Sequence, residues 1–134
     1  MLEQWHANQL LQVPKVYSST LMIDIGRGAD HDYPVESDDG NDHVLLDVRA
    51  SHRNPRKVRL QLRYRRDIVI ARLCTAVPHT NPDGRRLGFP HLHLYREGQD
   101  DKWAEELADL EDKAAALEYF CTRVRLPAPT PSGV

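Results

Sequence analysis

The residues of this chain best suited to chemistry are two histidines separated by one leucine, His91 and His93. Side chains alternate between the two faces of a β-strand, so both imidazoles would lie on one face together with Tyr95. Leu92 and Leu94 would then point to the opposite face, into a core. Imidazoles titrate near neutral pH and can carry protons or bind metal. The spacing therefore predicts a histidine site on one face of a strand.

A third histidine, His79, precedes an Asn-Pro-Asp-Gly turn, and arginines are dense upstream of it. Metal-free RNA cleavage needs a base for the 2′-hydroxyl proton, an acid for the leaving oxygen and cations around the phosphate. We predict that His79, His91 and His93 transfer protons. A tyrosine, Tyr64 or Tyr95, could replace one of them. Five arginines are predicted to bind phosphate or RNA: Arg59, Arg63, Arg65, Arg72 and Arg96.

The same residues allow other interpretations. A His-x-His pair on a strand is also a metal-ligand pattern, which Asp83 or Asp101 could complete. Arginines beside a cation are unfavourable and the spacing shows no third ligand, so we predict no metal and no cofactor. The histidines could instead form a hydrogen-bonded polar patch. The arginines could belong to the wet, charged face of an antiparallel sheet, or receive an acidic protein partner.

Charge is segregated along the chain, although the formal net charge is only −2. Residues 49–72 are rich in arginine, whereas residues 30–47 and 97–112 are acidic. Segregated charge creates local potentials that the net charge hides. The basic segment favours contacts with RNA phosphates. The acidic segments favour either a basic partner or pairing with the basic segment inside the fold.

Apolar periodicity predicts the elements that position these residues. Residues 2–13 have helical spacing and end at a proline. From Trp103 to Val124, apolar residues recur every three or four positions, which predicts helical structure in one or two pieces. Trp103 and Trp5 lie on these apolar stripes and are predicted to be in the core. Alternation predicts five strands, of which the last two form an antiparallel hairpin: 19–25, 33–35, 43–48, 58–65 and 68–74.

Together these elements predict a single α+β domain over residues 1–126. It would be a mostly antiparallel, twisted sheet of five or six strands, with the N-terminal helix and a C-terminal helical segment packed on one face. Residues 127–134 are proline-rich and predict an extended, flexible tail. The two cysteines form no metal-type pair and no disulfide framework, which predicts a cytoplasmic location. No apolar run reaches the ~20 residues of a membrane span.

Four segments carry a distinctive set of motifs: LRYRRDIV at 62–69, PHTNPDG at 78–84, PHLHLYREG at 90–98 and DKWA at 101–104. With these motifs, residues 56–104 resemble a bacterial and prophage domain family of uncharacterised function. That family is distantly similar to the TumE-type toxins of toxin–antitoxin loci. Those toxins pair an Arg-Tyr-rich hairpin strand with a Pro-His-His loop and a second Pro-His-x-x-His element.

TumE-type toxins are regarded as ribonucleases that a helix-turn-helix antitoxin holds in check. The resemblance therefore implies that Arg63, Tyr64, Arg65 and Arg72 belong to one site with the three histidines. It also implies RNA and an antitoxin or another protein as partners. The chain departs from the toxins in having Arg-Leu-Cys at 72–74, where they tend to have Arg-Tyr-Asp, and His-Leu-His for His-His-x-His. If the missing aspartate orients a histidine, activity would be weak or absent.

Two functions follow from these observations. The first is a toxin-like, metal-independent endoribonuclease that a partner protein controls. The second is a non-enzymatic, phage-encoded binding protein that inhibits a host defence complex, with its acidic surfaces imitating nucleic-acid phosphates. The two functions use the charges in opposite ways. The enzyme would depend on His91 and Arg63, whereas the inhibitor would depend on its aspartates and glutamates.

Overall fold

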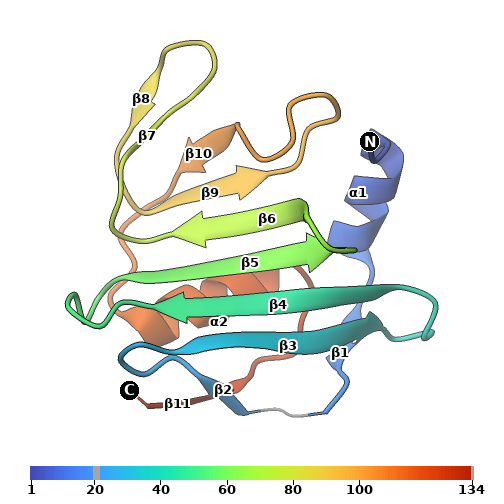
Figure 1. Cartoon of the computed structure of the whole chain (residues 1–134), viewed down its shortest axis with the longest axis horizontal. Helices are drawn as coiled ribbons and strands as arrows, with labels where there is room; N and C mark the ends of the chain where they lie inside the picture. The colour runs from blue at the N-terminus through green and yellow to red at the C-terminus, as the bar shows by residue number, and fades with distance from the viewer. Residues whose placement is uncertain (20–21, 134) are drawn as a thin grey trace.

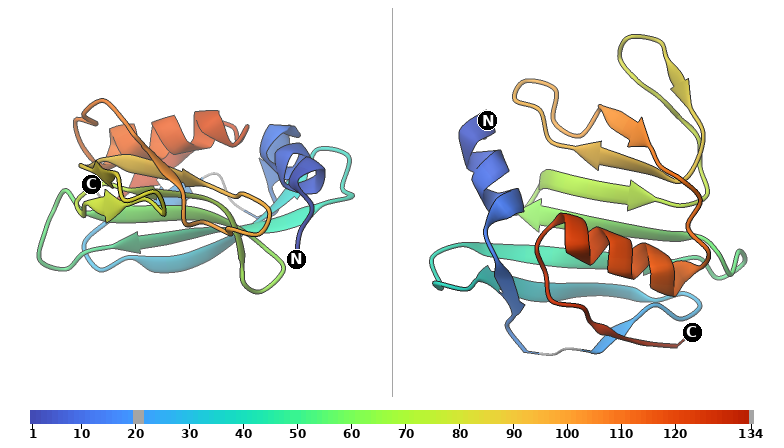
Figure 2. Two further views of the ribbon diagram at one scale, coloured as in Figure 1. Left: turned by 90° about the horizontal axis from the view of Figure 1, so that it is seen from above. Right: turned by 180° about the vertical axis from the view of Figure 1, so that it is seen from behind.

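The computed structural model of the chain describes residues 1–19 and 22–133. In this part of the chain a seven-stranded antiparallel sheet has the order β1-β3-β4-β5-β6-β9-β10, and both helices lie on one of its faces (Figures 1 and 2). Two short sheets, β11-β2 and β7-β8, complete the fold. In chain order the elements are α1 (Gln4–Gln12), β1 (Lys15–Tyr17), β2 (Met22–Asp24), β3 (Asp30–Ser37), β4 (His43–Ala50), β5 (Val58–Tyr64), β6 (Ile68–Cys74), β7 (His79–Thr80), β8 (Arg86–Leu87), β9 (His91–Leu94), β10 (Ala104–Glu106), α2 (Lys113–Arg123) and β11 (Thr130–Ser132).

The predicted α+β class, with helices at both ends of the chain and a large antiparallel sheet, is confirmed. The main sheet is somewhat larger than the five or six strands expected, because β1 and β10 pair at its edges. The hairpin of β5 and β6 and the histidine strand β9 lie where the alternation places them. The prediction that Tyr95 shares the face of the histidines is wrong: β9 ends at Leu94, and Tyr95 is buried in the core, where its hydroxyl donates a hydrogen bond to the carbonyl oxygen of Leu2. The predicted strand 19–25 corresponds to β2, and residues 20 and 21 of it lie outside the described residues.

The helical prediction for the segment that follows Trp103 is wrong as far as Asp112. Ala104–Glu106 form β10, which is antiparallel to β9, and α2 begins only at Lys113. The side chain of Asp112 caps this helix by accepting a hydrogen bond from the backbone N–H of Ala115 at 2.8 Å. The apolar residues before Asp112 have helical spacing, but this segment pairs with the edge of β9 and forms a strand instead.

Two other segments differ from the sequence interpretation. Trp5 is 63% exposed, since the apolar face of α1 is formed by Ala7 and Leu10. In the proline-rich segment 127–134, the residues Thr130–Ser132 form β11, which pairs in parallel with β2. At these three residues the predicted extended backbone is therefore held by its pairing with β2, outside the main sheet.

The core lies between the main sheet and its two helices. Leu46, Leu60 and Leu62 are fully buried on the helix-covered face, where they meet Phe120 and Leu117 of α2. Burial of each large apolar side chain contributes roughly 1.5–3 kcal/mol. Because side chains alternate along each strand, this core fixes which residues point to the opposite, open face.

Candidate active site on the open face of the sheet

Two neighbouring rows of side chains cross the face of the sheet that the helices leave open. Residues directly opposite one another on adjacent strands share a face, so the strand register defines each row. The first row, from β3 to β10, consists of Asp32, Asp47, Gln61, Arg72, His93 and Ala104. The second row consists of Asp30, Arg49, Arg59, Cys74, His91 and Glu106.

The three histidines predicted as site residues come together at the β9 end of these rows. The ring centroids of His79 and His93 are 4.5 Å apart, and those of His91 and His93 are 4.8 Å apart. The centroids of His79 and His91 are 5.5 Å apart. His91 and His93 are only 2% and 1% exposed, whereas His79 on β7 is half-buried. The cluster therefore has two inner rings and one outer ring.

Each imidazole donates one hydrogen bond to a backbone carbonyl of the surrounding loops. The donors are Nδ1 of His91, Nδ1 of His93 and Nε2 of His79, at 3.1, 2.7 and 2.7 Å. In the same order, the acceptors are the carbonyl oxygens of Gly88, Asp101 and Lys102. Since a carbonyl only accepts, each donor nitrogen carries the hydrogen, and the other nitrogen of the neutral ring keeps its lone pair.

Burial keeps the two inner histidines neutral. Burial and, to a smaller extent, the charge of Arg72 lower the pKa of His93 to about 4. Burial likewise lowers the pKa of His91. Arg72 lies between two neighbours: its Nη1 pairs with Asp101 at 2.7 Å, and its Nη2 lies 3.4 Å from Nε2 of His93. Its Nε is buried and has no hydrogen-bond partner in the described part of the chain.

Cys74 is a site residue that the sequence interpretation missed. β6 places it directly opposite His91 on β9. One ligand atom from each of Cys74, His91 and His93 lies within 4.8 Å of the other two. Burial raises the pKa of the Cys74 thiol. The only signal in the sequence was the alternation of β6, which places Cys74 on one face with Arg72.

A pocket of about 280 Å³ adjoins Cys74 on the same side of the sheet. Its polar side chains are those of Lys57, Arg59, Arg72, Thr75 and the cysteine itself, and Val58, Ala76 and Val77 complete the lining. Lys57 and Arg59 form no ion pair with any of the described residues. Cationic side chains bind phosphate through charge-assisted hydrogen bonds. The pocket therefore fits an anionic group beside the histidine cluster.

Three of the other predicted residues lie away from the histidines. Arg63 points to the open face, but its Nε and Nη2 bind the carboxylate of Asp47 at 2.8 and 3.0 Å. Tyr64 contacts α1, where its ring centroid is 5.3 Å from that of His6. Arg65 lies in the hairpin turn with φ 58°, and its guanidinium is 5.1 Å from the ring centroid of Tyr64. Of the five predicted arginines, Arg59 and Arg72 line the pocket beside the cluster.

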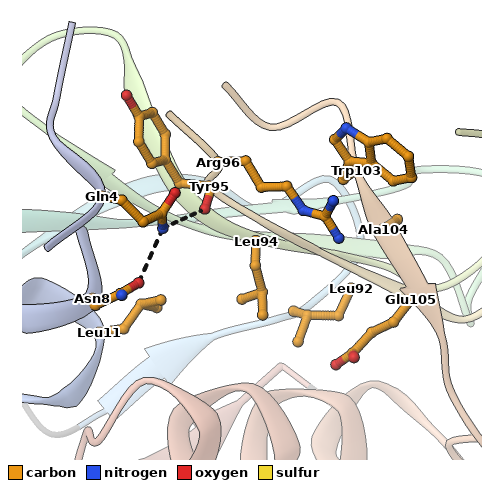
Figure 3. A pocket seen from close by; sticks show the side chains of 10 residues that line it. All are labelled: Gln4, Asn8, Leu11, Leu92, Leu94, Tyr95, Arg96, Trp103, Ala104 and Glu105. Carbon is orange, nitrogen blue, oxygen red and sulfur yellow. Dashed lines mark hydrogen bonds between the residues drawn. The ribbon is translucent and has the colours of Figure 1, made fainter. Parts of the chain in front are cut away.

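Arg96 belongs to a different pocket of about 400 Å³ on the helix-covered side of β9 and β10 (Figure 3). Its guanidinium lies 4.3 Å from the ring centroid of Trp103, which is half-buried rather than in the core. Leu92 and Leu94 point from β9 into this pocket. Because these leucines alternate with the histidines along β9, the pocket and the histidine cluster lie on opposite faces of one strand.

The fold and the site define an α+β protein that covers one face of an antiparallel sheet with helices and carries a histidine–cysteine cluster on the other. The chain belongs to a family of unknown function, DUF6978, whose model matches residues 2–126. This match confirms the expected membership of an uncharacterised domain family. No curated protein and no solved structure matches the chain. Neither helix in the described residues has the length and apolar character needed to cross a membrane.

Proposed function

We propose that the protein is a toxin-like endoribonuclease that acts in the cytoplasm and is held in check by a partner protein. The observation that carries the proposal is the histidine cluster beside a pocket with three cationic side chains. RNA cleavage requires proton-transfer groups next to cations that stabilise the charged phosphorane. The resemblance to TumE-type toxins supports the same class of reaction, because its motifs include the strands and loops that form the cluster.

In this proposal the residues of the site have different roles. Lys57, Arg59 and Arg72 bind the scissile phosphate in the pocket. Arg72 also lies 3.4 Å from His93, so a phosphate held by Arg72 lies beside the cluster. His79 is the most exposed of the three histidines and is the group that exchanges a proton with the RNA. The inner rings contact His79 and hold it in place.

The proposal is tested with mixed RNA and purified protein. We expect cleavage by the wild type and a loss of at least about 100-fold in His79→Ala. His43→Ala is the matched control, because His43 is an exposed histidine on β4 whose loss should leave cleavage unchanged. Cleavage that persists in EDTA supports metal-independent chemistry, whereas loss in EDTA places a metal in the site. A wild type that cleaves no RNA, alone or with added divalent metal, overturns the proposal.

The alternative function as an acidic inhibitor has less support. A surface that imitates nucleic-acid phosphates needs carboxylates that are free to meet a basic partner. Asp30, Asp32 and Asp47 are instead paired with Arg49 and Arg63 on the same sheet. Three of the seven acidic side chains of the segment 30–47 are therefore neutralised by arginines within the fold, and we propose the enzyme alone.

A further inference from the structure

We propose that Cys74, His91 and His93 form a binding site for a zinc ion. One ligand atom from each residue lies within 4.8 Å of the other two, so a small contraction brings all three onto a single ion. Two imidazoles and a thiolate are ligands that Zn²⁺ commonly takes. The sequence predicted no metal because spacing alone showed no third ligand. The pairing of β6 with β9 supplies it from the hairpin strand.

The hydrogen bonds of the inner histidines give a second, independent indication of a metal site. A metal-binding histidine usually donates its other ring N–H to a carbonyl or carboxylate, which fixes the orientation of the ring. His91 and His93 both donate Nδ1–H to a backbone carbonyl, at 3.1 and 2.7 Å. Nε2 of each ring is therefore the ligand atom. Among the hydrogen bonds of residues 1–19 and 22–133, the His91 ring uses Nδ1 alone, so its Nε2 is available to an ion.

The charges around the cluster are compatible with a bound cation. Arg72 is adjacent to His93, but its Nη1 is neutralised by the carboxylate of Asp101 at 2.7 Å. Its Nη2 contact with Nε2 of His93 is long, at 3.4 Å, and would give way to the metal. The thiolate of Cys74 would offset one of the two charges of the ion. A net positive charge would remain at the cluster, which favours an anion in the adjoining pocket.

The coordination of this ion would be incomplete with protein ligands alone. Three protein ligands leave a fourth position on a tetrahedral zinc ion, as in catalytic sites. Cys74 is both a ligand and part of the wall of the pocket that holds Lys57, Arg59 and Arg72. A phosphate in this pocket would therefore be next to the ion. This catalytic role rests on the proposed ribonuclease function, whereas zinc binding itself does not.

The test is a titration of the metal-free full chain with Co²⁺, followed by displacement with Zn²⁺. We expect one equivalent of Co²⁺ to produce a thiolate-to-cobalt charge-transfer band and the visible bands of a tetrahedral ion, which Zn²⁺ then removes. Cys74→Ser should lose the charge-transfer band, and His91→Ala should weaken binding at least tenfold. Cys121→Ser is the matched control, since Cys121 is buried in α2 against the helix-covered face and should leave the spectrum unchanged.

A measurement without substitutions keeps the test valid if a variant fails to fold. In the native wild type, Zn²⁺ should protect Cys74 from alkylation, as mass spectrometry of the modified peptide would show. Absence of both the charge-transfer band and this protection overturns the zinc site, as does a charge-transfer band that survives in folded Cys74→Ser. Zinc binding without RNA cleavage would retain the site and overturn the proposed function. Cleavage in EDTA without zinc binding would retain the proposed function and overturn the zinc site.

Discussion

The open face of the sheet has two halves that use similar residue types in different ways. In the paired half, on β3, β4 and β5, each arginine meets carboxylates within 4.0 Å; this half comprises Asp30, Asp32, Asp47, Arg49 and Arg63. In the histidine half, imidazoles and a thiol occupy the same rows; this half comprises Arg59, Arg72, Cys74, His91 and His93. Arg72 has one carboxylate partner there, Asp101, and Arg59 has none in the described chain.

The difference shows that the neighbours of an arginine on the open face decide what it can do. Arg63 already uses Nε and Nη2 on Asp47, so it has few donors left for a phosphate. Such a half-buried pair holds strands together, and breaking it leaves a charge uncompensated. Arg59 is exposed beside the pocket and forms no ion pair with the described residues, so it can bind an anion without losing an internal partner. We infer that the paired half stabilises the fold and the histidine half carries the function.

The largest expected effect is a loss of stability when a carboxylate of the paired half is removed. Asp47→Ala should lower the free energy of unfolding by about 3 kcal/mol, because it leaves the guanidinium of Arg63 without its main partner. Asp47 also accepts a hydrogen bond from Gln61 at 2.7 Å, which would be lost as well. Urea unfolding measures the change. RNA and zinc binding by the folded variant should match the wild type, and a stability loss below about 1 kcal/mol would contradict a structural role for the pair.

The corresponding substitution in the histidine half should have a different outcome. Asp101→Asn removes the carboxylate from Arg72 and should cost about 2 kcal/mol of stability, since both side chains are only 24% exposed. It should also strengthen RNA binding, because Arg72 gains an uncompensated charge beside the pocket. Fluorescence anisotropy with a labelled single-stranded RNA measures this effect. Asp30→Asn in the paired half is the control, and equal binding by the two variants would remove the distinction between the halves.

The strands that were predictable from the sequence are those whose two faces differ in polarity. In β5, Leu60 and Leu62 alternate with polar residues, and the pattern requires one buried and one open face. β10 has no such alternation: it is a strand because β9 offers it an edge. Leu107 and Leu110, which completed the false helical stripe, are only half-buried against the core. The local spacing of apolar residues could not distinguish a helix from an edge strand in this segment.

The site was predictable only where its geometry is local. His91 and His93 share a face because they are two residues apart on one strand, which the sequence shows directly. The nearness of Cys74 depends on the register between β6 and β9, and that register results from long-range pairing. The same holds for Arg63, whose partner Asp47 lies 16 residues away on another strand. The sequence showed where the cations are, but not which of them are already neutralised.

A smaller effect, on RNA affinity, is expected from removing the guanidinium of Arg59 in the histidine half. Arg59→Ala should weaken single-stranded RNA binding by about 1 kcal/mol, or roughly fivefold. The slope of log affinity against log salt should fall by about 0.7, the value for one lost phosphate contact. The melting temperature should not change, since Arg59 is exposed and unpaired among the described side chains. Arg49→Ala is the control in the paired half, and an equal loss of affinity there would mean that both halves bind RNA.

The smallest effect concerns the response of the paired half to acid. A side-chain hydrogen bond with Asp47 and the hydrogen bond from Arg49 lower the pKa of Asp32 from its usual 3.8. A carboxylate whose pKa is lower in the folded state stabilises the fold above its unfolded pKa, and this contribution is lost as the pH falls through the folded pKa. Asp32 is 45% exposed, so the contribution should be only about 0.5 kcal/mol. Asp32→Asn should therefore be less stable than the wild type by this amount at neutral pH, and the difference should shrink below pH 3.8 and disappear once the pH lies below the lowered pKa of the folded state. Urea unfolding across the acidic range, with Asp67→Asn as an exposed hairpin control, measures it. A difference that persists unchanged in acid would mean that the network is held by hydrogen bonds other than those of the ionised carboxylate.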